Sequence, residues 1–200
     1  EITELNAKWD NLIANSPDGT IFTNSAYLMS IQKQVRVFYC KKKQEIKAGV
    51  VLVVSDDILD SVKHDLVIYS GLIFAPSRPE KNRHQVISEN FRIATFIANN
   101  LADQYNKLFF NLPPTIKDIR PFIWHNYGTD SPKYNTEVRY TSFVYIDDFV
   151  KANKLEEIST YHHCSGSRRQ EIRYGLKDEV STREIFAPEQ FLDFYKMTME

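Results

Sequence analysis

The segment AGVVLVV, residues 48–54, is an unbroken apolar run within the longer stretch EIKAGVVLVVSDD, residues 45–57. An apolar run of this length, bounded by charged residues, is typical of a strand at the centre of a sheet, where other elements cover both faces. We therefore expect this strand to lie in the middle of the fold, with packed side chains on both of its sides.

Segments on either side of this run predict the partners of the central strand. VRVFYCKKK, residues 35–43, predicts a strand that a charged turn joins to it, and DLVIYSGLIFAP, residues 65–76, predicts a third strand. Gly71 inside the third strand indicates a bulge or the close approach of another backbone. A long helix is predicted from about Arg83 to Tyr105, because apolar residues recur on one face: Ile87, Phe91, Ala94, Ala98 and Leu101.

The remaining patterns complete an α/β (α+β) protein. Asn24 or Ser25 is expected to cap an early short helix. We expect one principal core, built from the central strands and the long helix, that includes Val51 and Phe91. The further predicted elements are helices at residues 2–16 and 24–33, strands at 107–114, 137–148 and 181–186, helical segments at 154–177 and a helix at 187–198.

The composition suits a globular protein with a sizeable core, since 42% of the 200 residues are hydrophobic and 13% are aromatic. A formal net charge of −1 argues against a general nucleic-acid binder, so any recognition of anions must be local. Cys40 and Cys164 are too few and too far apart for a disulfide framework or a zinc module, which favours a reducing cytoplasm. No apolar run approaches the ~20 residues that span a bilayer.

Both ends of the sequence indicate a piece of a longer chain. The first residue is Glu1 rather than Met, and QFLDFYKMTME, residues 190–200, has the pattern of the middle of a helix without a stop signal. Within the chain, a change of composition near Pro132 is the candidate domain boundary.

Cationic side chains gather in the segment SGSRRQEIRYGLK, residues 165–177. Ser167 and Gln170 have the spacing of a capping box, which predicts that a helix begins at Ser167. Arg168 and Arg169 then lie in the first turn, where unpaired amides already make the field positive. Two arginines at that end of a helix call for a negative partner.

Further along the same helix, Arg169, Arg173 and Lys177 recur at every fourth position and form a cationic stripe. Two interpretations stay open. The stripe is either a solvated charged face that Glu171 and Asp178 partly neutralise, or a surface that binds a phosphate or a carboxylate. Planar guanidinium groups suit both anions.

The segment DIRPFIWHNYG places an acid, a base and aromatic rings close together in the sequence. Asp118 and Arg120 are two residues apart, so in an extended segment they point to one side and can pair. One interpretation is a structural salt bridge that fixes a loop over the core. The other is a ligand cleft, in which Trp124 and Tyr127 form an apolar wall and Asp118 or His125 lies near an acceptor amine.

The triplet HHC, residues 162–164, raises the possibility of a metal site. Adjacent histidines on a helix point in different directions, and no other cluster of ligands supports them. We therefore predict a partly buried helix flank and no bound metal.

Several motifs together resemble a known family. In chain order they are PDGTIFTNSAYL (17–28), IYSGLIF (68–74), LPPTIKDIRPFIWHNYG (112–128), YTSFVYID (140–147) and SRRQEIRYGLK (167–177). This series resembles the Fem-type (FemAB-like) peptidoglycan-bridge aminoacyltransferases and their relatives in surface-polysaccharide clusters, within the GNAT acyltransferase superfamily.

The resemblance implies two GNAT-like subdomains in tandem, with an acceptor groove between them. Residues 1–135 would form a first subdomain, a mixed sheet flanked by helices, and residues 136–200 would begin a second. The implied activity is that of an acyl- or aminoacyltransferase in the cytoplasm, which modifies an amine of a cell-envelope sugar or peptide precursor. Its donor would be acyl-CoA or aminoacyl-tRNA, and its acceptor an anionic or nucleotide-linked small molecule.

The resemblance also implies roles for individual residues. It places Arg168, Arg169 and Arg173 along the groove between the subdomains. GNAT folds splay two central strands to admit the donor, which makes Tyr69 beside Gly71 a candidate binding residue; a plain β-bulge is the alternative.

A second class of function stays open beside the transferase. GNAT enzymes hold the donor's pyrophosphate on a Gln/Arg-x-x-Gly-x-Gly/Ala loop that opens a helix, and the sequence contains no such pattern. The family's aromatic-x-x-x-Lys motif is altered as well, because Ile31 lies four residues after Tyr27 and the lysine is at position 33. The alternative is therefore a non-catalytic ligand-binding module on a degenerate GNAT scaffold.

Overall fold

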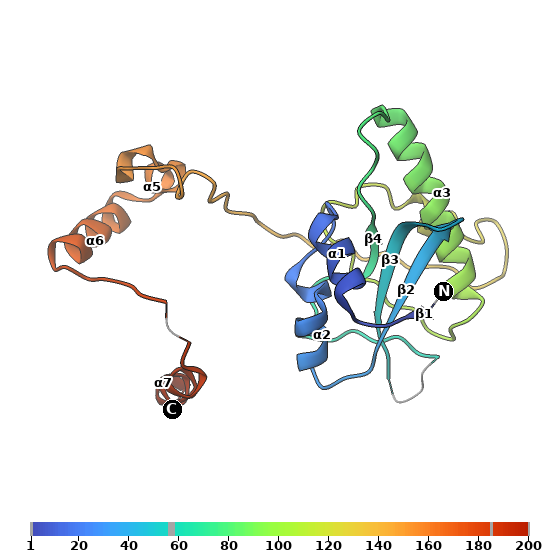
Figure 1. Cartoon of the computed structure of the whole chain (residues 1–200), viewed down its shortest axis with the longest axis horizontal. Helices are drawn as coiled ribbons and strands as arrows, with labels where there is room; N and C mark the ends of the chain where they lie inside the picture. Colours follow the sequence, from blue (N-terminus) through green and yellow to red (C-terminus); the bar gives the residue numbers. More distant parts are fainter. Residues whose placement is uncertain (1, 56–58, 185, 200) are drawn as a thin grey trace. The chain divides into compact units, whose positions relative to one another are not determined.

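The computed structural model of the protein describes residues 2–55, 59–184 and 186–199 (Figure 1). The chain divides into two compact units, Glu1–Glu137 and Val138–Glu200, and each is described by itself. The described residues form seven α-helices and a four-stranded sheet, so the predicted α+β class is confirmed. The mixed sheet that the resemblance implies is wrong for these residues, because every strand pairing is antiparallel. None of the helices among the described residues has the length and hydropathy that a membrane span requires.

The sheet belongs to the first unit. Its strands lie in the order β1 (Ile2–Thr3), β2 (Val35–Lys42), β3 (Glu45–Val53) and β4 (Gly71–Phe74), and each neighbouring pair is antiparallel. Because β3 pairs with both β2 and β4, the apolar run that begins at Ala48 lies inside the sheet, as predicted.

The first predicted helix, at residues 2–16, is shorter than expected, because its beginning is the strand β1. Helix α1 spans Ala7–Asn15. Its N-cap is Asn6, whose side-chain oxygen accepts hydrogen bonds from the amides of Lys8 and Trp9 at 3.0 and 3.1 Å. This cap ends the helix on its N-terminal side.

A short 3₁₀ turn, η1 (Ile21–Thr23), and helix α2 (Ser25–Ser30) follow. The side chain of Asn24 accepts a hydrogen bond from the amide of Ala26 at 3.0 Å, so Asn24 is the N-cap of α2. It is one of the two caps that the sequence predicts.

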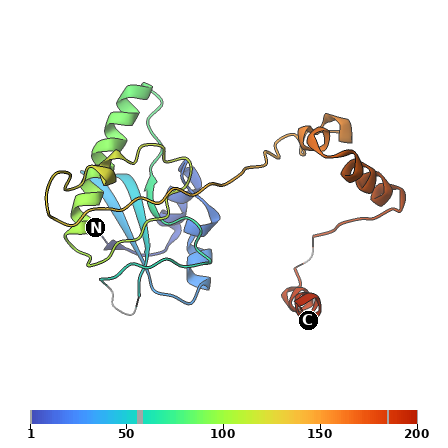
Figure 2. The same ribbon diagram turned by 180° about the vertical axis from the view of Figure 1, so that it is seen from behind.

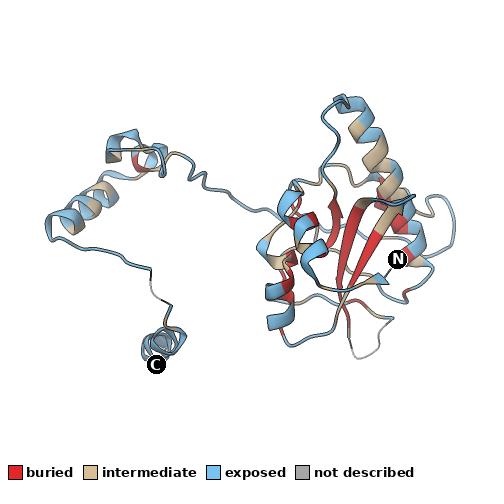
Figure 3. Ribbon diagram, viewed as in Figure 1, coloured by how far each residue is buried: buried red, intermediate tan, exposed pale blue. Residues whose placement is uncertain are grey.

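Side chains of β3 enter two hydrophobic clusters, one on each face of the sheet. Helices α1 and α2 lie on one side of the sheet and the long helix lies on the other (Figures 1 and 2). Val51 packs with Trp9 of α1 and Leu28 of α2 on one face. Leu52 packs with Ala98 of the long helix on the other face. The predicted cover on both faces is therefore confirmed, and the buried residues gather along the strands (Figure 3). The expected single core is instead two clusters that share β3.

The long helix α3 spans Arg83–Ala102 and ends before the predicted Tyr105, because the chain turns at Asp103. Its buried residues all lie in its C-terminal half: Ala94, Ile97, Ala98 and Leu101. Ile87 is exposed and Phe91 is half-buried. Neither is therefore a buried residue of the core, in which the sequence pattern places them. The N-terminal half of α3 thus leaves the adjoining end of the sheet uncovered by apolar side chains.

Residues 107–114 do not form the predicted strand. Lys107 makes an isolated parallel bridge with Asp60, and Asn111 makes an isolated antiparallel bridge with Ser70. The two bridges go to different segments, so no continuous ladder forms, and the prolines that follow Leu112 cannot donate backbone hydrogen bonds. A short helix, α4 (Arg120–Ile123), comes next and packs against α3.

Gly71 has φ +94°, in the region that favours glycine. A Cβ atom at this position would lie 2.9 Å from the ring of Phe110. A close approach is therefore present, but its partner is the side chain of Phe110 and not the backbone that the sequence predicts.

The second unit contains a 3₁₀ turn and three α-helices: η2 (Leu155–Glu157), α5 (Ser159–His163), α6 (Gly166–Lys177) and α7 (Pro188–Met199). Among its described residues only Tyr161 is buried. The helix predicted from Ser167 begins at Gly166 instead, because Ser165 is its N-cap and accepts a hydrogen bond from the amide of Arg168 at 3.3 Å.

The two strands predicted in this region are wrong over the residues that the structure describes. Residues 137–146 and 181–184 have no regular secondary structure, and residue 185 of the second prediction lies outside the described residues. Apolar side chains such as Tyr140 and Val144 are exposed. A strand requires a hydrogen-bonded neighbour, and the described part of this unit supplies none.

The buried position of β3 predicts a clear difference between two leucines. Leu52→Ala removes a fully buried side chain and should lower the free energy of unfolding of the first unit by about 2–5 kcal/mol. Leu66→Ala makes the same change at an exposed position and should alter it by less than about 0.5 kcal/mol. Urea denaturation of both variants measures this, and equal losses would mean that the core is misplaced.

Candidate functional site

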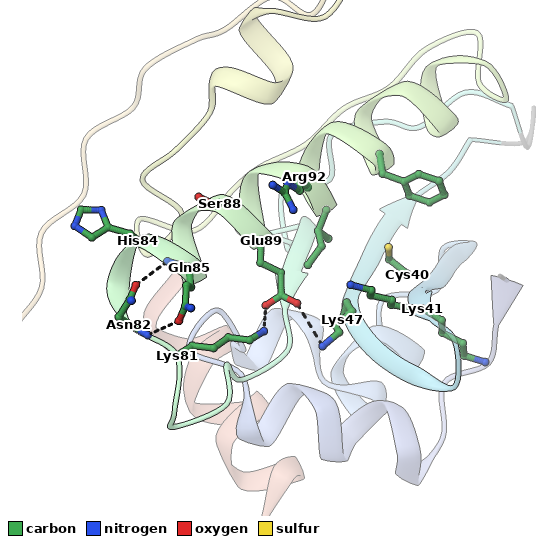
Figure 4. A pocket seen from close by; sticks show the side chains of 13 residues that line it. Cys40, Lys41, Lys47, Lys81, Asn82, His84, Gln85, Ser88, Glu89 and Arg92 are labelled. Atoms are coloured by element: carbon green, nitrogen blue, oxygen red, sulfur yellow. Dashed lines mark hydrogen bonds and ion pairs between the residues drawn. The ribbon is translucent and has the colours of Figure 1, made fainter.

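A pocket of about 650 Å³ opens between the β2–β3 hairpin and the N-terminal half of α3 (Figure 4). The hairpin contributes Cys40, Lys41 and Lys42 from β2 and Lys47 from β3. The opposite wall comes from α3 and the residues just before it. The pocket lies where α3 has no buried residue, so polar side chains of the helix face the polar end of the hairpin.

The lining of this pocket carries an excess of positive charge. Its lysine, arginine and carboxylate residues are Lys41, Lys42, Lys47, Lys81, Arg92 and Glu89. The whole chain has a formal net charge of −1, so this excess is local. A cleft lined by one sign of charge concentrates ions of the opposite sign, and this pocket therefore attracts anions.

Glu89 joins the two walls of the pocket. Its carboxylate forms an ion pair with Lys81, and its Oε1 lies 3.4 Å from Nζ of Lys47 on β3 (Figure 4). Lys47 is also 2.7 Å from Oε1 of Glu45, which in turn pairs with Arg78 at 2.9 Å. The hydrogen bond from Lys81 lowers the pKa of Glu89, although partial burial opposes the shift. Glu89 is thus a carboxylate, and a poor proton acceptor, at neutral pH.

The first turn of α3 forms one end of the pocket. Asn82 and Gln85 make a capping box, with the two reciprocal hydrogen bonds at 3.0 Å, and both residues line the pocket together with His84 (Figure 4). The N-terminus of a helix carries partial positive charge, which adds to the attraction for anions.

Cys40 contributes the sulfur atom of the pocket. Burial raises the pKa of its thiol, so it is protonated at neutral pH and is not an activated nucleophile. Together with Ile93 and Phe96 it forms an apolar part of the lining. The described lining therefore favours the binding of an anion that also carries an apolar group over nucleophilic attack by the thiol.

Asp118 and Arg120, predicted from the sequence to pair, form a bidentate salt bridge. Nε and Nη2 of Arg120 donate to Oδ1 and Oδ2 of Asp118 at 2.8 and 2.6 Å. The guanidinium carbon lies 5.2 Å from the ring centre of Phe91 on α3 and 5.4 Å from that of Trp124. The hydrogen bond from Arg120 lowers the pKa of Asp118, with partial burial opposing it. This geometry favours the structural interpretation, a clamp between α4 and α3.

The two residues proposed as an aromatic wall, Trp124 and Tyr127, are both exposed. Trp124 is half-exposed and contacts Phe91 edge-on at 5.8 Å, whereas Tyr127 is 79% exposed. His125 lies 2.8 Å from Oδ1 of Asn99 through its Nδ1 atom, so α3 holds it in place. Asp118 and His125, the two candidates for the acceptor amine, are thus both engaged in contacts within the protein.

The other predicted site residues lie elsewhere. Tyr69 is half-buried beside Phe22, at 6.0 Å between ring centres, and Phe22 packs on the face of the sheet that α1 covers. Arg168, Arg169 and Arg173 belong to α6 in the second unit.

Contacts within α6 favour the solvated interpretation of its charged face. Arg168 forms an exposed ion pair with Glu171, and Nε of Arg173 donates to the carbonyl of Arg169 at 3.3 Å. Glu171 is one of the acids that the sequence suggests as a neutralising partner. The histidines of HHC are exposed, and no group of three possible metal ligands occurs among the described residues.

Sequence reasoning missed the pocket between the hairpin and α3. In the sequence the lysines of β2 and β3 belong to two predicted strands with a charged turn between them, and residues 83–92 belong to the beginning of the predicted long helix. Only the folded chain brings the two segments together, since no spacing rule connects residue 47 with residue 89.

Comparisons of the chain with models of protein families, with curated proteins and with solved structures find no match.

The salt bridge between Asp118 and Arg120 predicts a pH-dependent contribution to the free energy of unfolding. Because the folded pKa of Asp118 lies below its unfolded value of about 3.9, the contribution is present above that value and is lost as the pH falls through the folded pKa. Asp118→Asn should therefore lower the free energy of unfolding at neutral pH, and the difference from the unaltered protein should shrink toward about pH 2.

Urea denaturation across this pH range measures the effect, with Asp130→Asn, at an exposed position, as the control. A loss of stability that is the same at all pH values would contradict a role for the charge of Asp118.

Proposed function

We propose that this protein binds a small anionic ligand, in the pocket between the β2–β3 hairpin and α3. The observation that carries the proposal is the lining itself, which contains five lysine and arginine residues and a single carboxylate. Like charges repel when they are brought together, so this arrangement costs stability unless a negative partner offsets it. A ligand with phosphate or carboxylate groups is such a partner.

Arg92 supports a ligand-binding role most directly. Arg92 lines the pocket and is exposed, and no described residue makes an ion pair or hydrogen bond with its guanidinium group. Its planar guanidinium can form two parallel hydrogen bonds to a phosphate or a carboxylate. The apolar group formed by Cys40, Ile93 and Phe96 suits a ligand with a hydrophobic or ring portion beside its anion.

We further propose that the ligand is a substrate of an acyl- or aminoacyltransferase related to the Fem-type enzymes. Both donors implied by the resemblance, acyl-CoA and aminoacyl-tRNA, carry phosphates, as does a nucleotide-linked acceptor. The reaction would be direct attack of a neutral amine on the donor's ester or thioester carbonyl, with the protein holding both partners in position. An α+β sheet with helices on both faces is compatible with a GNAT-like subdomain.

The alternative is a ligand-binding module without catalytic activity, and one observation favours it. Two ionisable side chains of the described lining are not prepared to remove a proton from an amine, because ion pairs lower the pKa of Glu89 and burial keeps Cys40 protonated. The amine's proton would have to pass to His84, which also lines the pocket, to water or to a group outside the pocket.

Substitution of Arg92 tests the binding site. Because Arg92 has no ion-pair partner among the described residues, Arg92→Gln removes one cation without leaving an unpaired acid. We expect it to weaken the binding of pyrophosphate about threefold or more in isothermal titration calorimetry. Lys117→Gln removes a cation at an exposed position outside the pocket and should change the affinity by less than about twofold. Equal effects of the two variants would mean that binding is non-specific.

Release of free thiol from acetyl-CoA, with an amine as acceptor, tests whether residues 1–200 carry transferase activity by themselves. The chain lacks the Gln/Arg-x-x-Gly-x-Gly/Ala loop, so we expect residues 1–200 alone to bind acetyl-CoA without turning it over. Thiol release above the protein-free rate that is lost in Arg92→Gln would contradict this expectation and favour the transferase.

A further inference from the structure

Glu89 is the one carboxylate among the cations that line the pocket, and it contacts cations from both walls. Lys81 precedes α3 and Lys47 lies on β3, yet their ammonium groups converge on the same side chain. The three side chains are partly shielded from water, with relative exposures of 25%, 12% and 26% for Lys81, Lys47 and Glu89. Figure 4 shows the carboxylate between the two ammonium groups.

Two ammonium groups that face one anion beside a helix N-terminus are also the arrangement that binds a phosphate. In the unliganded protein the anion in this arrangement is the side chain of Glu89. Lys47 keeps a second partner, Glu45, whose other contact is Arg78. Lys81 has no other ion pair among the described residues, so Glu89 alone balances its charge.

We propose that Glu89 is an internal substitute for the ligand's anion and that a bound ligand displaces its carboxylate from Lys81 and Lys47. This inference rests on the proposed binding function, and it adds a rule of selectivity. A ligand with one negative charge only replaces one carboxylate by another, whereas a ligand with two or more charges gains attraction to both ammonium groups. The pocket therefore selects phosphate-bearing ligands over simple carboxylates.

Displacement has a consequence for the affinity. The carboxylate of Glu89 repels an incoming anion and must leave its two partners before the anion can contact them, so Glu89 weakens binding. An ordinary lining residue that contacts the ligand would have the opposite effect, since its removal would weaken binding. Neutralising Glu89 thus distinguishes the two roles by the sign of the change.

Glu89→Gln tests the displacement by calorimetric titration of the protein with pyrophosphate and, separately, with acetate. We expect pyrophosphate to bind about fivefold more tightly than to the unaltered protein. We also expect acetate to bind more tightly by a similar factor, because the cost of displacing the Glu89 carboxylate is the same for both anions and is absent from the variant. Asp103→Asn removes one negative charge at the other end of α3 and should leave both affinities within about twofold.

The outcomes separate the inference from the proposed function. If the unaltered protein binds pyrophosphate and Glu89→Gln binds it equally or more weakly, Glu89 is a structural residue and the displacement is refuted. If neither protein binds pyrophosphate, the proposed function fails, and the displacement fails with it.

A measurement on the unaltered protein covers the case in which the variant does not fold. The carboxyl carbon of Glu89 can be titrated by nuclear magnetic resonance with and without saturating sulfate, which keeps its charge over the acidic range. Lys81 and Lys47 hold the pKa of Glu89 low in the free protein. Displacement predicts that this pKa rises when sulfate is bound, and an unchanged pKa would refute it.

Discussion

The burial of β3 on both faces is the constraint on which the first unit depends. From Ala48 to Val54 the strand has no polar side chain, so two separate layers must exclude water from it. Helices α1 and α2 cover one face and the C-terminal half of α3 covers the other. The rest of the unit, including the position of the pocket, follows from where these apolar patterns end.

The pocket exists because the apolar side chains of the β2–β3 hairpin and those of α3 stop at the same end of the sheet. In the hairpin, apolar residues are followed by Lys41 and Lys42, and in α3 the first buried residue is Ala94. Neither surface gains by closing on the other, since both carry charges that would lose their hydration. A polar opening is left beside a closed hydrophobic layer.

The carboxylates at this opening serve both stability and selectivity. Hydrogen bonds and ion pairs from Lys47 and Arg78 lower the pKa of Glu45, as those from Lys81 and Lys47 do for Glu89. The stabilisation from both groups is therefore present above their unfolded pKa and is lost in acid. These acids allow the lysines to lie close together without a ligand, and for the same reason Glu89 competes with one.

Local patterns predicted much of this fold, because the responsible interactions lie within a few residues. The central strand, the beginning of α3, the cap at Asn24 and the pair of Asp118 and Arg120 all belong to this class. Non-local pairing decided the errors. Residues 107–114 and 137–146 have the composition of strands, but bridges with two different segments replace a ladder in the first, and the second has no described neighbour.

The same distinction explains the candidate site. The clamp around Arg120 was visible in sequence because its acid is two residues away, although its aromatic partner Phe91 was not. The pocket joins Lys47 to Glu89 across a long interval of sequence, so only the folded chain reveals it.

The alkylation rate of Cys40 tests the central claim, that an anion occupies the pocket between the hairpin and α3. In the Cys164→Ser variant Cys40 is the one remaining thiol of the chain, and it lines the pocket. Iodoacetamide is uncharged, so its approach does not depend on the electrostatic effect of a bound anion. The account predicts that pyrophosphate slows the alkylation of Cys40 and that the effect saturates together with binding. An unchanged rate at saturating pyrophosphate would contradict it.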